Sequence, residues 1–396
     1  MKSVEEALAL VLDHSFSLKE TELLPLEQCL NKCLAKAVQA PIDLPSYRQS
    51  SMDGYAMSLG DSHTYTLVGE IKAGDSANPK LNPGECVRIF TGAVVPDTAY
   101  AVVMQEKTVA KGTIVEVRAS INKGQNIRAV GSQVQKGDLP LEKGQILQAS
   151  GLAFLQSLGI RELEVIRTPK VTLILTGNEL ISPSEKLSRG KIYESNSVLL
   201  KAALQQQGIT PNLVSFSEDT LEATVHSLKE AFFTSDLVLV SGGISVGDYD
   251  FVKKALALLE VEELFYKVRQ RPGKPLFFGK KEKSFVFALP GNPASTLSCF
   301  YVYVLPLLAR LKGSQSEGLV RVAIPLAHDF SSEEPRALFL KASVTDKSVS
   351  ILDRQHSSML VSFAKANALV YIPENGASLK KGALVEVLLL PNTVLT

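Results

Sequence analysis

The 396-residue sequence has no tryptophan, only four cysteines and only five histidines, and these absences narrow the classes of protein that it can encode. Cys29, Cys33, Cys86 and Cys299 are too scattered for a disulfide framework, and no histidine cluster accompanies them to complete a metal site. We therefore expect four reduced thiols in the core. The dispersed histidines also give no support to a Ser/His/Asp triad.

Neither sign of charge is in excess, because 42 basic residues stand against 41 acidic ones. Such a balance gives no indication of a nucleic-acid or membrane partner. No uncharged run reaches the roughly 18 residues of a membrane-spanning helix. Acidic residues interrupt the apolar N-terminus, MKSVEEALAL, which is therefore unlike a signal peptide. A cytoplasmic protein is the expectation.

A chain of this length exceeds what one hydrophobic core usually supports, so several domains are expected. Ser3 and Glu6 have capping-box spacing at the start of a predicted helix, and a second helix is predicted over Leu26 to Val38. Short strand-like runs separated by Gly, Pro, Asn and Asp fill residues 65–117 and predict an inserted β unit. The elements after it form no core of their own, so we expect them to pair with the N-terminal elements.

The most regular part of the chain alternates strands with helices. The runs VTLIL, NLVSF, DLVLV, ELFYKV and FVFAL alternate with helical patterns at 195–207, 220–233, 249–259 and 294–311. This alternation is typical of a doubly wound α/β domain with a mainly parallel sheet, which binds ligands beyond the carboxyl ends of its strands. After a Gly/Ser-containing link, further strands predict a small β-barrel or sandwich.

The expected fold class is therefore multidomain α/β plus β. The expected domains are a discontinuous N-terminal domain (1–44 and 133–168), an inserted β-rich domain (45–132), an α/β domain (169–313) and a C-terminal β-barrel (314–396).

The stretch DLVLVSGGISVGDYD, residues 236–250, joins a strand-like run to a helical pattern through several glycines. Gly242 and Gly243 begin the turn and Ser245 follows. Such a turn offers backbone N–H groups and the positive end of a helix dipole to an anion. A tight turn with Asp250 or the aspartate two residues before it as a helix cap is the alternative that this stretch alone leaves equally open.

Four other strand ends carry the segments TGNEL, FSED, RQRPGKP and LPGNPAS. Carboxylates beside a phosphate repel it, by roughly 4 kcal/mol for two unit charges 4 Å apart at a dielectric near 20. A magnesium ion held by one or two carboxylates and the phosphate would relieve this repulsion. Taken alone, each segment also fits a helix cap or a solvated turn. Their coincidence at one sheet edge favours a ligand site.

The motifs SMDGYA, FTGA, GQNIR, TGNEL, SGGISVGDYD, RPGKP, LPGNPAS and RQHSSML, in this order, resemble those of the molybdenum insertases. This family is also called the molybdopterin molybdenumtransferases, or MoeA in bacteria, and includes the insertase domain of gephyrin. The resemblance implies an elongated homodimer of four-domain subunits, with dimerisation through the discontinuous domain and molybdopterin binding by the α/β domain. It also implies a magnesium-dependent reaction of adenylylated molybdopterin with molybdate that releases AMP, and contact with a molybdopterin adenylyltransferase.

The resemblance assigns roles to single residues. The implied catalytic residues are Asp53, Thr91, Glu179, Asp250 and Lys274. The implied molybdopterin-AMP site consists of Gly242, Gly243, Ser245, Asp219, Pro290, Pro293 and Ser295. The implied molybdate ligands are Arg271, Lys274, Pro275, Arg336 and Ser357, and Glu179 and Asp250 would hold magnesium. Asp53 and Thr91 would reach the site across the dimer interface.

Three departures from the family pattern stand out. Glu218 occupies the first position of the family's usual aspartate pair, and Arg271 replaces a lysine, which exchanges a point charge for a planar fork. Residues 129–133 lack the arginines and the Glu-Asp pair that often follow GQNIR. A catalytic insertase remains the favoured function, because the acidic groups and Lys274 are retained. The alternatives are a non-catalytic carrier or scaffold and, less favoured because it would use the α/β domain alone, an adenylyltransferase.

Overall fold

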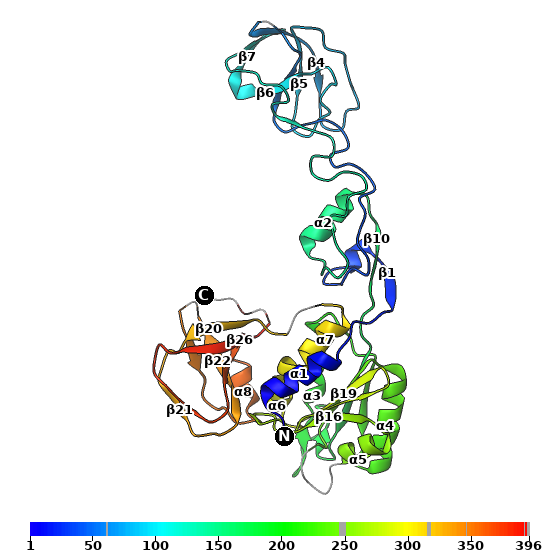
Figure 1. The fold of residues 1–396 in the computed structure, drawn as a ribbon, viewed down its shortest axis with the longest axis vertical. Coiled ribbons are helices and arrows are strands. Elements are labelled where there is room, and N and C mark those ends of the chain that lie inside the picture. Colours follow the sequence, from blue (N-terminus) through cyan, green and yellow to red (C-terminus); the bar gives the residue numbers. More distant parts are fainter. Residues whose placement is uncertain (61, 245–250, 315–317, 346, 392, 394–396) are drawn as a thin grey trace. The chain divides into compact units, whose positions relative to one another are not determined.

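The computed structural model describes residues 1–60, 62–244, 251–314, 318–345, 347–391 and 393 (Figure 1). The chain folds into two compact units, one formed by residues 1–22 with 166–396 and the other by residues 23–165. The division into four domains expected from the sequence remains a proposal.

The first unit contains a six-stranded sheet in the order β14-β11-β15-β19-β18-β16. Its strands are β11 (Val171–Thr176), β14 (Leu213–Ser217), β15 (Leu237–Ser241), β16 (Glu262–Tyr266), β18 (Phe277–Lys281) and β19 (Ser284–Leu289). The first four strands of this order are parallel neighbours. The expected α/β architecture is confirmed.

Helices cover both faces of this sheet (Figure 1). One face carries α1 (Val4–His14), α3 (Asn196–Gln205), α6 (Pro293–Cys299) and α7 (Leu305–Leu311), and the other carries α4 (Leu221–Thr234) and α5 (Phe251–Leu258). All six residues of β11 are buried, with Leu173 in one core and Ile174 in the other. Burial on both faces explains the continuous apolar runs in the sequence.

Strand β18 is absent from the sequence prediction, and two of its five residues are lysines. It runs antiparallel to both β19 and β16. A two-residue turn connects β18 to β19, and Glu282 adopts a positive φ of 53° within it. A positive φ in a two-residue connection is characteristic of hairpin turns.

The predicted long helix at 294–311 is interrupted by a π-helical segment, η3 (Phe300–Val304). Pro306 lies in the first turn of α7 and has no N–H to donate to the preceding helical turn. The run Pro293–Leu311 is long and apolar enough to span a bilayer, but 83% of it is buried inside the protein, as in a core helix.

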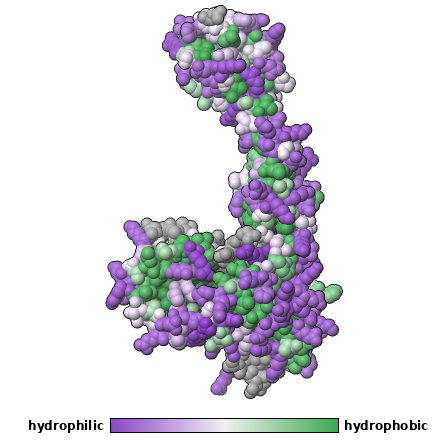
Figure 2. All heavy atoms as spheres, in the orientation of Figure 1, coloured by the Kyte–Doolittle hydropathy of each residue, from purple (hydrophilic) through white to green (hydrophobic). Residues whose placement is uncertain are grey.

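On the face shown in Figure 2, hydrophilic residues surround scattered apolar ones.

Helix α1 has the predicted capping box, in which Ser3 Oγ accepts from Glu6 N and Ser3 N donates to Glu6. Its buried side chains, Val4, Ala7 and Val11, pack in the same core as β11 and α7. The sequence prediction assigns α1 to the discontinuous domain, whereas in the structure α1 packs against the α/β sheet of the first unit.

A second sheet lies in the C-terminal part of the same unit. Its strands are β17 (Gln270–Arg271), β20 (Arg321–Pro325), β22 (Ala337–Val344), β23 (Val349–Ile351), β24 (Ala368–Ile372) and β26 (Leu384–Leu389). A two-stranded sheet of β21 (Phe330–Ser332) with β25 (Ala377–Leu379) and the short helix α8 (Leu360–Phe363) complete this part. Because β17 pairs with β22, the RPGKP segment begins on the C-terminal sheet.

The second unit contains the predicted β insertion as a six-stranded sheet in the order β6-β3-β5-β4-β8-β7. These strands are β3 (Gly54–Met57), β4 (Thr64–Ile71), β5 (Glu85–Ile89), β6 (Ala101–Met104), β7 (Thr108–Lys111) and β8 (Ile114–Val117). The remaining elements are the pair β2 (Gln49–Ser50) and β9 (Ile127–Arg128), the pair β1 (Thr21–Pro25) and β10 (Glu162–Ile166), helix α2 (Ala149–Ser157), and the 3₁₀ turns η1 (Leu26–Gln28) and η2 (Gln105–Lys107).

The predicted helix over Leu26 to Val38 is wrong. Only η1 forms there, and the chain then extends so that Cys33 and Leu34 form isolated bridges with Ile146 and Val165. The helix-like spacing instead places Leu26, Leu34 and Val38 in a core shared with α2 and β10. All four cysteines are free and buried, as expected.

One partly buried ion pair connects the chain before β11 to the start of β15. Arg167 donates to Asp236 through Nη1 and Nη2, at 2.7 and 2.8 Å, and Lys170 N donates to the same carboxylate at 2.7 Å. The two side chains are 21% and 14% exposed. Removal of one partner would leave the other charge poorly solvated. The intact pair joins the starts of β11 and β15 at the sheet edge opposite the predicted ligand site.

We expect Asp236→Ala to lower the free energy of unfolding by about 1–3 kcal/mol, since Arg167 loses two short hydrogen bonds and keeps only the more distant carboxylate of Glu20, at 3.6 Å, as an ionic partner. Chemical denaturation followed by circular dichroism measures this loss. Lys380→Ala is the control, because it breaks the exposed Lys380–Asp329 pair and should cost less than about 1 kcal/mol. Equal effects of the two variants would contradict the prediction.

Candidate functional site

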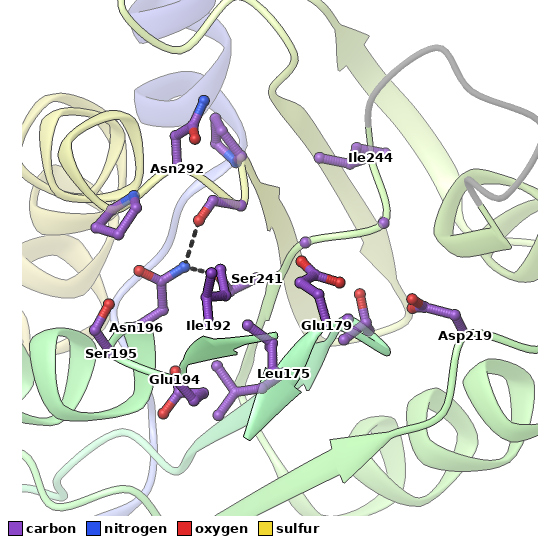
Figure 3. A pocket seen from close by; sticks show the side chains of 18 of the residues that line it. Leu175, Glu179, Ile192, Glu194, Ser195, Asn196, Asp219, Ser241, Ile244 and Asn292 are labelled. Atoms are coloured by element: carbon purple, nitrogen blue, oxygen red, sulfur yellow. Dashed lines mark hydrogen bonds between the residues drawn. The ribbon is translucent and has the colours of Figure 1, made fainter. Parts of the chain in front are cut away.

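A pocket of about 410 Å³ opens at the carboxyl ends of the parallel strands in the first unit (Figure 3). Its wall combines residues from the ends of β11 and β15, the start of α3 and the loop between β19 and α6. Seven of the predicted site residues line it: Glu179, Asp219, Gly242, Gly243, Pro275, Pro290 and Pro293. The structure thus brings together the predicted strand-end segments where α/β proteins bind ligands.

The turn after β15 requires glycine at its first position and favours it at its second. Gly242 has a φ of 97°, and a Cβ there would lie 2.5 Å from Thr176 O. A Cβ on Gly243 would lie 2.8 Å from Val252 Cγ2 and 3.0 Å from Thr176 Oγ1. The backbone therefore approaches the end of β11 directly, as in an anion-binding turn. Ser245 and Asp250 lie outside the described residues.

Two carboxylates, those of Glu179 and Asp219, face the same space beside this turn (Figure 3). Asp219 accepts a hydrogen bond from Asn178 N at 2.9 Å. Neither carboxylate caps a helix: Thr220 caps α4, and Glu179 precedes the short strand β12 (Leu180–Ile181), which pairs with β13 (Ile192–Tyr193). The cap interpretation of these two residues is wrong, and both carboxylates are available to the pocket.

The donor set of the pocket fits a magnesium ion that binds together with a phosphate. Within the described part of the chain, no group of three or more His, Cys, Asp or Glu residues forms a complete metal site. Magnesium characteristically keeps water ligands and takes only one or two carboxylates, with the remaining oxygens from a phosphate ligand. Glu179 and Asp219 satisfy that requirement, whereas Asp250 falls outside the described residues.

Asn196 is a pocket residue that the sequence prediction missed. Its Nδ2 donates to Ser241 Oγ and to Gly291 O, both at 2.8 Å, whereas its Oδ1 is buried without a hydrogen-bond partner in the described structure. Glu194 lies two residues earlier and accepts from Ser197 N at 2.7 Å. The signal in the sequence is the polar run YESNS before an apolar helix. Through its two Nδ2 hydrogen bonds, Asn196 of α3 connects this helix to β15 and to the LPGNPAS loop.

The LPGNPAS loop links the pocket to the C-terminal part of the unit. Pro293 begins α6, one residue before the predicted helix start at 294, and Thr296 Oγ1 donates to Pro290 O at 2.5 Å. Asn292 Nδ2 donates to Ser357 Oγ at 3.2 Å, so this predicted molybdate ligand is attached to the pocket rim. Ser295 is 2% exposed within α6 and does not line the pocket.

A buried lysine holds the segment that carries Ser357. Lys341 is 1% exposed, and its Nζ donates to the carbonyl oxygens of Arg354, His356 and Met359 at 3.0, 3.2 and 3.3 Å. These three carbonyls satisfy the ammonium, whose burial would otherwise be costly. The position of Ser357 therefore depends on a residue inside β22.

The predicted cationic residues are Arg271 and Lys274 of the RPGKP segment and Arg336, which directly precedes β22. Arg271 and Arg336 both bond to Glu334. Lys274 is exposed and forms no ion pair with the described residues. A buried network supports this segment: Gln270 Nε2 donates to Pro272 O at 3.0 Å, and Tyr303 of η3 donates to Gln270 Oε1.

Asp53 and Thr91 lie in the second unit, where they bond to each other. Thr91 N and Oγ1 both donate to Asp53 Oδ1 at 2.7 Å. These bonds, the backbone one first, lower the pKa of Asp53 below its ordinary value. Gly54 allows the close approach of β3 to β6, because a Cβ there would lie 1.9 Å from Val103 O. The motifs SMDGYA and FTGA therefore form one acidic site on this unit.

The fold and the pocket define a protein with a doubly wound α/β part whose pocket lies at the carboxyl ends of the parallel strands. Three family models match the chain: "MoeA N-terminal region (domain I and II)" at residues 2–159, "Probable molybdopterin binding domain" at 172–310, and "MoeA C-terminal region (domain IV)" at 323–390.

Known relatives match along nearly the whole chain. The molybdopterin molybdenumtransferase of Staphylococcus epidermidis is 31% identical over 98% of this chain and 95% of its own length, and that of Staphylococcus aureus is 30% identical with the same coverage. The crystal structure of the molybdopterin biosynthesis MoeA protein from Pyrococcus horikoshii is 30% identical, covers 98% of this chain and 100% of that chain, and has a TM-score of 0.84. The chain belongs to the molybdopterin molybdenumtransferase family, a family of transferases in molybdenum cofactor biosynthesis.

We expect Thr91→Val to raise the pKa of Asp53 part of the way toward its ordinary value, because the hydroxyl bond to the ionised form is lost and the backbone bond remains. Asp53 will then protonate at a higher pH than in the parent protein. Carbon-13 NMR titration of the aspartate carboxyls measures the change. Thr91→Ser, which keeps the hydroxyl, should leave the pKa nearly unchanged, and a pKa that falls in Thr91→Val would contradict the assignment.

Proposed function

We propose that this chain inserts molybdenum from molybdate into adenylylated molybdopterin, with cleavage of the phosphoanhydride and release of AMP. The observation that carries the proposal is the pocket in which the Gly242–Gly243 turn lies beside the carboxylates of Glu179 and Asp219. Gly242 N already donates to Leu289 O at 3.2 Å, so Gly243 N is the proposed phosphate donor in the turn. The carboxylates favour a divalent cation next to the phosphate.

In this proposal the chain acts by binding and orientation. The glycine turn and the LPGNPAS loop hold the adenylylated pterin, and Asn196 fixes these two segments relative to each other. Glu179 and Asp219 would hold magnesium, with Asp250 as a further proposed ligand, and the bound ion would neutralise charge on the phosphate oxygens. Arg271, Lys274, Arg336 and Ser357 are the proposed molybdate ligands.

The family resemblance supports three further proposals. The subunits form a homodimer, in which Asp53 and Thr91 complete the site of the partner subunit. A molybdopterin adenylyltransferase supplies the adenylylated substrate, and the reaction takes place in the cytoplasm. Binding of the reactive substrate directly from that enzyme would protect it from water.

We expect the purified protein, given adenylylated molybdopterin, magnesium and molybdate, to release AMP and to yield cofactor that activates an apo-molybdoenzyme. AMP is measured by chromatography, and cofactor by the regained activity of the apo-enzyme. Omission of magnesium should suppress both signals. Tight substrate binding with AMP release no faster than in a protein-free control would favour the carrier or scaffold function instead.

We also expect Asp53→Ala to reduce AMP release by at least about tenfold, while the dissociation constant of the pterin substrate changes little. The reason is that the residue lies outside the α/β pocket and belongs to the proposed catalytic set. Asp75→Ala, in the same unit and also exposed, is the control for general effects of removing an acidic group. Equal loss of substrate binding and turnover in Asp53→Ala would refute the catalytic role.

A further inference from the structure

A carboxylate occupies the position between two of the proposed molybdate ligands. Glu334 Oε1 accepts from Arg336 Nε at 2.7 Å, and Glu334 Oε2 accepts from Arg336 Nη2 at 2.9 Å. The same Oε2 also accepts from Arg271 Nη1 at 3.2 Å. Arginine binds molybdate-like oxyanions through the same N–H groups that it offers to a carboxylate. Glu334 therefore engages the donors that an oxyanion would use.

The position of this carboxylate is fixed by the surrounding backbone. β17 pairs with β22 at Arg271 and Leu338, and this pairing brings the two arginine-bearing segments together. Glu334 N donates to Ser332 Oγ at 3.2 Å. The Glu334 side chain is 15% exposed, compared with 46% for Arg271 and 32% for Arg336. It is thus the least solvated member of the cluster.

The cluster carries one positive charge in total, from two guanidinium groups and one carboxylate. Each guanidinium has five N–H groups, and Glu334 engages two of Arg336 and one of Arg271. Among the described residues no further hydrogen bond from these two guanidinium groups is found, so their other N–H groups can bind a dianion. The bonds to the two arginines, that of Arg336 first, hold the pKa of Glu334 at about 2, so the carboxylate keeps its charge at neutral pH.

We propose that Glu334 is an internal competitor that weakens the hold of Arg271 and Arg336 on molybdate. The inference rests on the proposed function only for the assignment of these two arginines to the oxyanion. A dianion bound to them lies beside a negative charge, which raises its free energy in the site. Weak binding serves an insertase, because the oxyanion must leave its protein ligands to reach the dithiolene. An interaction that stabilises bound molybdate and the transition state equally does not increase the turnover rate.

The test compares molybdate binding by the full-length parent protein and Glu334→Gln, measured by isothermal titration calorimetry at low ionic strength. We expect Glu334→Gln to lower the dissociation constant of molybdate by about tenfold, after allowance for the partial exposure of the site. The difference should shrink as salt is added. Glu334→Ala, which removes the same charge by a different side chain, should act in the same direction.

Glu374→Gln is the matched control. Glu374 accepts from Arg269 Nε at 2.8 Å, so this variant removes a carboxylate from another arginine pair while leaving Arg271 and Arg336 paired with Glu334. It should leave the dissociation constant of molybdate unchanged. Unchanged or weaker binding in both Glu334 variants would overturn the inference and assign Glu334 the role of aligning the arginines. A tenfold gain in Glu374→Gln as well would also overturn it, since the effect would then be one of general charge.

Arg336→Gln separates this inference from the proposed function. If the parent protein binds molybdate and Arg336→Gln loses most of that binding, the oxyanion site of the proposed function is supported, and the Glu334 variants decide the inference by themselves. If the parent protein binds no molybdate at millimolar concentration, the assignment of the arginines fails, and the inference fails with it. AMP release then remains an independent measure of the pterin reaction.

Discussion

The direct approach of the turn after β15 to the end of β11 is the constraint on which the pocket depends. Because a Cβ on Gly242 would lie only 2.5 Å from Thr176 O, no side chain fits between the two strand ends. The turn therefore exposes backbone rather than side chain to the pocket, and carboxylates, amide groups and prolines are left to form the remaining walls. An α/β sheet supplies the position, and the glycines leave room beside the strand ends for the anion that we propose binds there.

Buried polar side chains then connect segments that are distant in the chain. Asn196 ties α3 to Gly291, Gln270 supports the RPGKP segment, and Lys341 fixes the loop of Ser357. Each of them is buried and donates to at least one backbone carbonyl, so each one defines the path of a loop. Loops held in this way can present side chains with little loss of entropy on binding, which is the basis of preorganisation.

The sequence predicted the α/β architecture and the pocket because both depend on local patterns. Apolar runs identify parallel strands, and segments at their carboxyl ends share one edge. The failures have physical causes too. The apolar residues at helical spacing in 26–38 belong to an extended chain that packs against α2. In β18, two of the five residues are lysines, which do not indicate a buried strand. Lys341 has no signal in the sequence, and the polar run around Asn196 does not reveal its role, because the importance of both residues lies in which carbonyls they reach.

The distribution of acidic and basic side chains favours a site that binds its substrates only transiently. The acidic groups Glu179 and Asp219 lie in the pocket with the glycine turn, whereas Arg271 and Arg336 lie where the RPGKP segment meets the C-terminal sheet. A storage site for an oxyanion would gain from every unpaired arginine. Here the carboxylate of Glu334 already neutralises one of the two positive charges. A transferase must release the oxyanion from its protein ligands as well as bind it. This partial neutralisation of the arginines therefore fits a transferase better than a carrier.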